Sequence, residues 1–119
     1  MKRDMDLIRK ILLHVEENDN LKFAIDRYEQ REIAYHVRLL VEAELLKAVA
    51  IPVLSGDIVL QDTGHTALTW GGHEFLDAAR DEGRWNKAKG IVKEKAGTVT
   101  VAAFTQLLVQ IMKDAIGLP

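Results

Sequence analysis

The chain contains no cysteine, so it has neither a disulfide framework nor a thiolate metal site. Its longest apolar runs are short, such as Ala48–Leu54, and fall far below the roughly 18 residues needed to cross a bilayer. Residues 1–6 lack the apolar core and the small-residue cleavage site of a secretory signal peptide. These absences fit a cytoplasmic protein without a membrane segment.

Motifs of catalytic sites are missing as well. Ser55 is the only serine, and no Gly-x-Ser-x-Gly surrounds it. Gly71-Gly72 is not followed by the lysine and hydroxyl residue of a phosphate loop, and His73-Glu74 lacks the second histidine of a zinc protease. The four histidines show no metal-ligand spacing. We therefore expect no enzyme activity, no cofactor and no metal.

The composition is that of one soluble domain, with 119 residues of which 48% are apolar. The net charge of -2 argues weakly against a strong nucleic-acid binder. Basic residues nevertheless gather in 84–95, where five of them stand against the single acidic residue Glu94. Two interpretations remain open: the segment contacts a phosphate backbone, or it is a solvated helix face.

Apolar periodicity predicts a first helix over about 4–17. Residues 21–26 alternate between apolar and charged side chains, which predicts a short edge strand. A second helix is predicted over about 28–44, with Ile33, Val37 and Leu40 on its apolar side and His36 beside them as a partly buried structural histidine.

The next segment predicts a hairpin, with strands over 47–53 and 58–60 and a turn between them. Thr69 is the expected N-cap of a following helix that ends at residues 81–83. Another helix is predicted from Trp85 to Lys95, ended by Ala96-Gly97, and both Trp70 and Trp85 are expected to anchor the core.

The last predicted helix, about 100–116, is apolar over more than half its circumference. Such a helix needs more than one partner surface, so it is either the centre of its own core or a seam with a second copy. The residues expected at such a seam are Phe104, Leu108, Ile111 and Met112.

The order of helix, hairpin, Leu-Thr-x-x-Gly strand and helix is typical of a winged-helix domain. The sequence thus predicts an α+β fold, with a winged-helix domain over 1–83 and a C-terminal helical extension over 84–119. Two departures stand out. Glu44 occupies a position where glycine is common, which predicts another turn type or a longer helix. Residues 18–29 are too few for the first helix of a helix-turn-helix.

Three segments resemble a known family. They are Met-Lys-Arg-Asp-Met-Asp-Leu-Ile-Arg-Lys-Ile-Leu at residues 1–12, Ile-Ala-Tyr-His-Val-x-Leu-Leu at 33–40, and Leu-Thr-Trp-x-Gly-His-Glu-Phe-Leu at 68–76. Together they resemble the domain of unknown function 2513 family, over most of residues 1–95. The resemblance implies a bacterial, phage or prophage protein of the cytoplasm, and it supplies no activity and no catalytic residues.

A candidate binding face lies on the predicted second helix. At about 100° per residue, Arg31, Tyr35 and Arg38 lie opposite the apolar stripe, with Arg27 beside them if the helix begins early. Arginine forks and a phenol can contact bases and phosphates. The alternative is an ordinary solvated face. In the DNA-binding interpretation, the C-terminal cations that contact phosphates are Lys87, Lys89 and Lys93.

The hairpin tip argues against ordinary wing–DNA contact, because residues 55–66 contain Asp57 and Asp62 but no lysine or arginine. Two hypotheses follow. The first is a dimeric DNA-binding accessory or regulatory protein that binds double-stranded DNA. The second is a protein-interaction module that has lost DNA binding and docks a host or phage protein.

Overall fold

The computed structural model describes residues 1–95 and 100–118. Over these ranges it is a mixed α+β protein with five helices and two antiparallel two-stranded sheets. The chain divides into two compact units, Met1–His73 and Glu74–Pro119. The boundary lies within one helix, whereas the sequence predicted a boundary after residue 83. No helix in the described ranges has both the length and the apolar character of a membrane span.

Helix α1 covers Met5–Asn18, close to its predicted bounds. The Asp4 carboxylate caps it by accepting a hydrogen bond from the Leu7 amide at 3.1 Å. The helix ends where Asp19 turns into the left-handed region, with φ of 52°. The predicted apolar stripe is fully buried and consists of Leu7, Ile8, Ile11, Leu12 and Val15.

The strand predicted over 21–26 is wrong, because residues 21–25 form no strand and residues 26–27 form a turn. Leu21 and Phe23 are nevertheless buried, so the alternating pattern does report which side chains enter the core. A strand also needs a hydrogen-bonded neighbour, and strand preference alone does not supply one.

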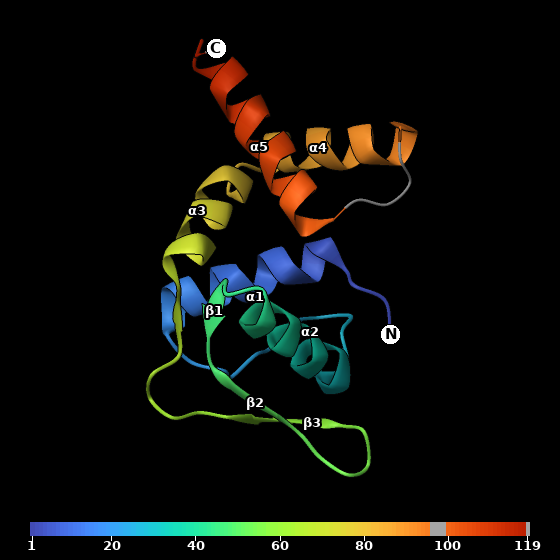
Figure 1. Ribbon diagram of the computed structural model, residues 1–119, viewed down its shortest axis with the longest axis vertical. Helices are drawn as coiled ribbons and strands as arrows, with labels where there is room; N and C mark the ends of the chain where they lie inside the picture. Colours follow the sequence, from blue (N-terminus) through green and yellow to red (C-terminus); the bar gives the residue numbers. More distant parts are fainter. Residues whose placement is uncertain (96–99, 119) are drawn as a thin grey trace. The chain divides into compact units, whose positions relative to one another are not determined.

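Helix α2 covers Gln30–Glu42 and lies between α1 and the hairpin of the same unit (Figure 1). The expectation for Glu44 is wrong: it adopts a left-handed φ of 60°. Its amide donates to Val41 O at 3.0 Å, and the Leu45 amide donates to Leu40 O at 2.9 Å. This pair of bonds is a Schellman motif, which is usually closed by glycine. Helix α2 therefore ends in the conformation that glycine usually adopts, and Glu44 holds a left-handed backbone that is unfavourable for a residue with a side chain.

Strands β2 (Val49–Pro52) and β3 (Ile58–Gln61) form the predicted hairpin. Strands β1 (Leu46–Lys47) and β4 (Ala67–Leu68) pair at its base. Between the two ladders, Ala48 on one side faces the five residues 62–66 on the other. The chain between β3 and β4 therefore forms a five-residue bulge opposite Ala48 before pairing resumes.

Helix α3 covers Trp70–Ala79 and begins at the predicted N-cap, because Thr69 Oγ1 accepts from the Gly72 amide at 3.0 Å. The Thr69 hydroxyl donates to Glu44 O, which joins this cap to the end of α2. Gly72 packs closely on the same turn: a Cβ at this position would lie 2.0 Å from Leu45 O. Only glycine fits this approach.

Helices α4 (Glu82–Lys95) and α5 (Val101–Ala115) pack against each other in the second unit (Figure 1). Residues 82–83 were predicted to end α3 but instead begin α4, because Asp81 caps that helix by accepting from the Arg84 amide at 2.8 Å. Thr100 caps α5 by accepting from the Ala103 amide. The predicted end of the helix at Ala96-Gly97 lies outside the described residues.

The two tryptophans differ. Trp85 is 2% exposed, and its ring meets Phe75 and Phe104 edge-on, with centroids 6.4 and 5.0 Å away. It is a core anchor as predicted. Trp70 is 82% exposed, so the same prediction for Trp70 is wrong. As the first residue of α3, it lies outside the apolar side of that helix.

Candidate functional site

The predicted face of α2 carries two arginines that both meet carboxylates. Arg31 Nε lies 3.2 Å from Asp57 Oδ1 on the hairpin, and Arg38 Nε lies 3.1 Å from Glu42 Oε1 one turn further along α2. The Arg31 side chain is 66% exposed and that of Arg38 is 41% exposed. Exposed pairs of this kind contribute about 0–1 kcal/mol. Both guanidinium groups are therefore held in place weakly.

Tyr35 lies half-buried on the same side, with its ring edge-on to that of His36. Arg27 does not join the helix, because α2 begins three residues later at Gln30. It sits in the turn before the helix with φ of 73° and an exposed side chain. The predicted set therefore reduces, on the helix itself, to Arg31, Tyr35 and Arg38.

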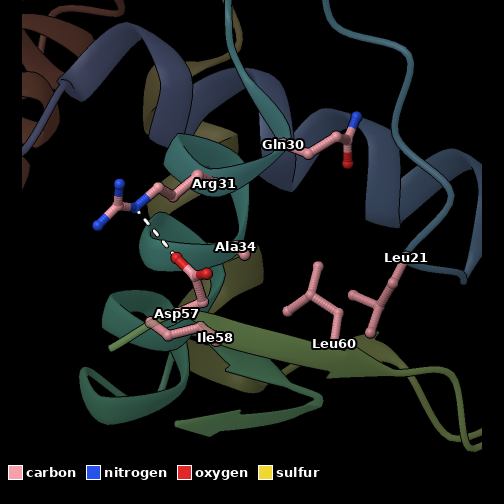
Figure 2. Close-up of a pocket in the computed structure, with 7 residues that line it drawn as sticks. All are labelled: Leu21, Gln30, Arg31, Ala34, Asp57, Ile58 and Leu60. Carbon is pink, nitrogen blue, oxygen red and sulfur yellow. Dashed lines mark ion pairs between the residues drawn. The ribbon is translucent and has the colours of Figure 1, made fainter. Parts of the chain in front are cut away.

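A pocket of about 520 Å³ lies between α2 and β3. Figure 2 shows the Arg31–Asp57 ion pair at one end of it, and Leu21 and Leu60 near each other at the other end. A smaller hollow of about 180 Å³ shares this ion pair. Its lining residues are Met1, Arg31, Tyr35, Gly56, Asp57 and Ile58. The ion pair therefore lines both hollows, and Met1 reaches the smaller one.

The N-terminal segment is fixed to α2 through His36, which is fully buried as a structural histidine. The Asp4 amide donates to His36 Nε2 at 2.8 Å, and His36 Nδ1 lies 2.8 Å from Glu32 O. Because an amide can only donate, Nε2 is the acceptor, and Nδ1 carries the proton and donates to the carbonyl. Both ring nitrogens are satisfied in this neutral tautomer.

Tyr28 adds a second anchor, because its hydroxyl donates to Asp4 Oδ2 at 3.0 Å. Burial and this hydrogen bond raise the pKa of Tyr28 to about 12. The Lys10 ammonium lies 5.5 Å from the centroid of the same ring. Sequence reasoning missed these anchors, because their partners are 24 and 32 residues apart and no local pattern links them.

The C-terminal cations lie in the second unit, on α4. Lys87 and Lys93 are exposed, and Lys89 is half-buried. Lys87 and Lys93 are six residues apart, which places them on different sides of the helix at about 100° per residue. They do not form a single stripe. The structure therefore does not gather the arginines of α2 and the lysines of α4 within one compact unit.

The apolar residues of α5 divide into two groups. Phe104, Leu108 and Ile111 are buried within the chain. The sequence left open whether they form its own core or a seam with a second copy, and their burial favours the core. Met112 is half-buried, and Ile116 beyond the helix end is 64% exposed. Of the four residues expected at a seam, Met112 is therefore the one that is not buried within the chain.

The hairpin exposes an apolar surface that sequence reasoning did not single out. Ile51 and Val59 are directly opposite each other across the strands, at 42% and 48% exposure, and Leu54 at the tip is fully exposed. Alternation along the strands was the available signal, because successive residues of a strand face opposite sides of the sheet, and every second one therefore faces away from α2. The exposed members are Ile51, Val53, Leu54 and Val59.

Comparison with known proteins identifies the family of this mixed α+β protein. The model of the hypothetical-protein family DUF2513 matches residues 2–98, so the chain belongs to that family. A relative, an uncharacterized protein of Haemophilus influenzae, is 31% identical over 112 residues, covering 90% of this chain and 92% of its own. No solved structure matches the chain. The resemblance seen in the sequence is confirmed, and the phage or prophage origin stays a prediction.

Proposed function

We propose that the chain is a winged-helix-type DNA-binding accessory or regulatory protein of a phage or prophage, with α2 as its recognition helix. The order α1, α2 and hairpin supports this, together with the packing of the hairpin on α2. The observation that carries the proposal is the grouping of Arg31, Tyr35 and Arg38 on one side of α2, where Arg31 and Tyr35 also line a hollow with the hairpin.

The carboxylate partners of the arginines do not exclude phosphate binding. Each exposed ion pair contributes at most about 1 kcal/mol, whereas a charge-assisted hydrogen bond from arginine to phosphate is among the stronger polar contacts. A phosphate can therefore displace Asp57 or Glu42 at small cost. No helix lies between α1 and α2, so the proposed groove contact is made by α2 without the first helix of a usual helix-turn-helix.

The proposal includes a twofold dimer that presents two α2 faces to a palindromic site. Its seam cannot consist of Phe104 and Leu108, which are buried within the chain. The side chains of α5 and its C-terminal end that remain for it include Met112 and Ile116.

The test is fluorescence anisotropy with a labelled random-sequence duplex, at low and then moderate salt, on protein whose mass is measured by light scattering. We expect wild-type binding that weakens steeply with salt. Arg31→Glu combined with Arg38→Glu should abolish it without loss of helix content. The control is Lys22→Glu with Lys113→Glu, which makes the same charge change at two other exposed positions. Binding by the α2 variant equal to wild type would exclude this face.

A protein-interaction module is the second candidate, and the hairpin favours it. Its outward apolar side chains and the absence of lysine or arginine over residues 48–66 suit a protein partner better than a phosphate backbone. Binding through this surface would depend little on salt. The same titration separates the two candidates, because absence of duplex binding at low salt leaves only the second.

A further inference from the structure

The hairpin has a free edge on the side of β3. In the described part of the chain, β3 pairs with β2 alone. The turn shows which backbone groups face outward: the Val53 amide donates to Asp57 O at 2.9 Å, and the Gly56 amide donates to Val53 O at 2.9 Å. Val53 and Asp57 are therefore a hydrogen-bonded pair, and bonded and non-bonded pairs alternate from there along the ladder. Ile58 and Leu60 fall in non-bonded pairs, so their N–H and C=O groups point away from β2.

The opposite edge of the hairpin is protected, and the β3 edge is not. On β2, Pro52 stands in a non-bonded pair, where proline offers no outward N–H to a further strand. Strand β3 contains neither proline nor a charged residue, which are usual means of blocking an exposed edge. An edge without such residues is a template for pairing with another extended chain. Of the two edges, β3 is therefore the one that can accept a partner strand.

The pocket of about 520 Å³ lies beside this edge. The two residues with outward backbone groups, Ile58 and Leu60, both line it, and no lining residue comes from β2. Its volume falls within the range of about 300–1,000 Å³ that is usual for ligand pockets. The end between Leu21 and Leu60 is apolar, whereas Arg31 and Asp57 pair with each other at the other end (Figure 2). An aliphatic side chain therefore suits the end near Leu60.

We propose that the β3 edge binds an extended peptide segment of a partner protein as an additional antiparallel strand, with an aliphatic side chain of the peptide in the pocket. Antiparallel pairing is the more stable arrangement per residue, and it uses the outward N–H and C=O groups of both Ile58 and Leu60. A peptide residue directly opposite Leu60 has its side chain on the same face of the sheet as Leu60, which is the pocket side. The backbone edge and the pocket thus recognise the same alternate residues of the peptide.

The inference goes beyond duplex binding and does not depend on it. It also concerns a different part of the hairpin from the outward apolar surface, because Ile58 and Leu60 face the pocket whereas Ile51 and Val59 are exposed on the other face. The partner is defined by its chemistry: an extended segment with aliphatic residues at alternate positions and free backbone N–H groups at those same positions.

The first test uses a fluorescein-labelled short peptide in which threonine and leucine alternate, with binding followed by fluorescence anisotropy. Leucines seated in the pocket have N–H groups that point at β3, whereas the N–H groups of the threonines point to solvent. N-methylation of the leucines should therefore weaken binding by about tenfold or more. N-methylation of the threonines is the matched control and should leave binding nearly unchanged.

The second test changes the protein. Leu60→Pro removes an outward N–H and an aliphatic side chain from the β3 edge, and it should abolish binding of the unmodified peptide. The control is Ala50→Pro, because Ala50 is directly opposite Leu60 and its N–H points outward from the other edge. It should keep peptide binding. Neither substitution removes a ladder hydrogen bond, and circular dichroism checks that both variants fold. If Leu60→Pro does not fold, the two N-methylated peptides decide alone.

Several outcomes would overturn the proposal. They are absence of binding by the unmodified peptide, equal binding by the two N-methylated peptides, and equal loss of binding in the two folded proline variants. Light scattering tests another occupant: if the wild type is a dimer and Leu60→Pro is a folded monomer, a second copy occupies the edge and the peptide proposal falls. The DNA-binding proposal is judged separately, because duplex binding is measured without the peptide.

Discussion

The two compact units differ in the contacts that stabilise each of them internally. In Met1–His73 the joints between elements are directional and polar: His36 receives the Asp4 amide, and the Thr69 hydroxyl binds Glu44 O. In Glu74–Pro119 the centre is an edge-on row of three aromatic rings. The first unit therefore adds polar joints at a few backbone atoms to its apolar core, whereas the second unit centres on buried aromatic rings.

The largest expected effect comes from emptying the aromatic core. Trp85→Ala removes a ring that packs against Phe75 and Phe104, and it should lower the free energy of unfolding by about 3–5 kcal/mol. Urea unfolding followed by circular dichroism measures the change. Trp70→Ala is the control, because that side chain is 82% exposed and its loss should cost less than about 0.5 kcal/mol. Equal losses would refute the assignment of Trp85 as the anchor.

The second largest effect on stability is expected from adding one methyl group where α3 approaches the turn after α2. Gly72→Ala places a Cβ 2.0 Å from Leu45 O, and separating α3 from this turn should cost about 3 kcal/mol. Gly90→Ala is the matched control, because Gly90 is also helical and nothing lies within 4 Å of an added Cβ. It should stabilise the protein by about 1 kcal/mol through helix propensity. Thermal unfolding distinguishes the two, and a shift in the same direction for both would contradict this close approach.

The smallest expected effect relieves strain at the end of α2. Glu44→Gly keeps both Schellman hydrogen bonds and removes the left-handed penalty of a side chain, which should stabilise the protein by about 0.5–1 kcal/mol. Glu17→Gly makes the same substitution at an exposed helical position and should destabilise by about 1 kcal/mol. Loss of stability in both variants would place Glu44 outside the left-handed region.

Local chemistry made the helices predictable from sequence. The α1 stripe and the Thr69 cap appeared where the pattern indicated, because 3.6-residue periodicity and a capping hydroxyl act over a few residues. The strand over 21–26 failed because alternation reports burial, whereas a strand also requires a partner from elsewhere in the chain. The prediction that Trp70 anchors the core was wrong because apolar character alone does not determine whether the first residue of a helix faces the core.

The candidate site was predictable only in part. Helical spacing placed Arg31 and Arg38 on one side of α2, as found. The pairing of Arg31 with Asp57 and the attachment of Asp4 to His36 join residues 26 and 32 positions apart, which no periodicity encodes. Glu44 shows a different limit, because two hydrogen bonds hold a glutamate in a conformation that local preference disfavours.

The bulge between the two ladders has a consequence for how the chain can change in length. Residues 62–66 stand against Ala48 alone, and pairing resumes on both sides of them. Four of the five, from Asp62 to His65, are exposed. Insertions or deletions there would be absorbed by the loop and would leave the strand register, and with it the position of the hairpin on α2, unchanged. The segment is therefore a natural place for relatives to differ in length and for a probe sequence to be inserted.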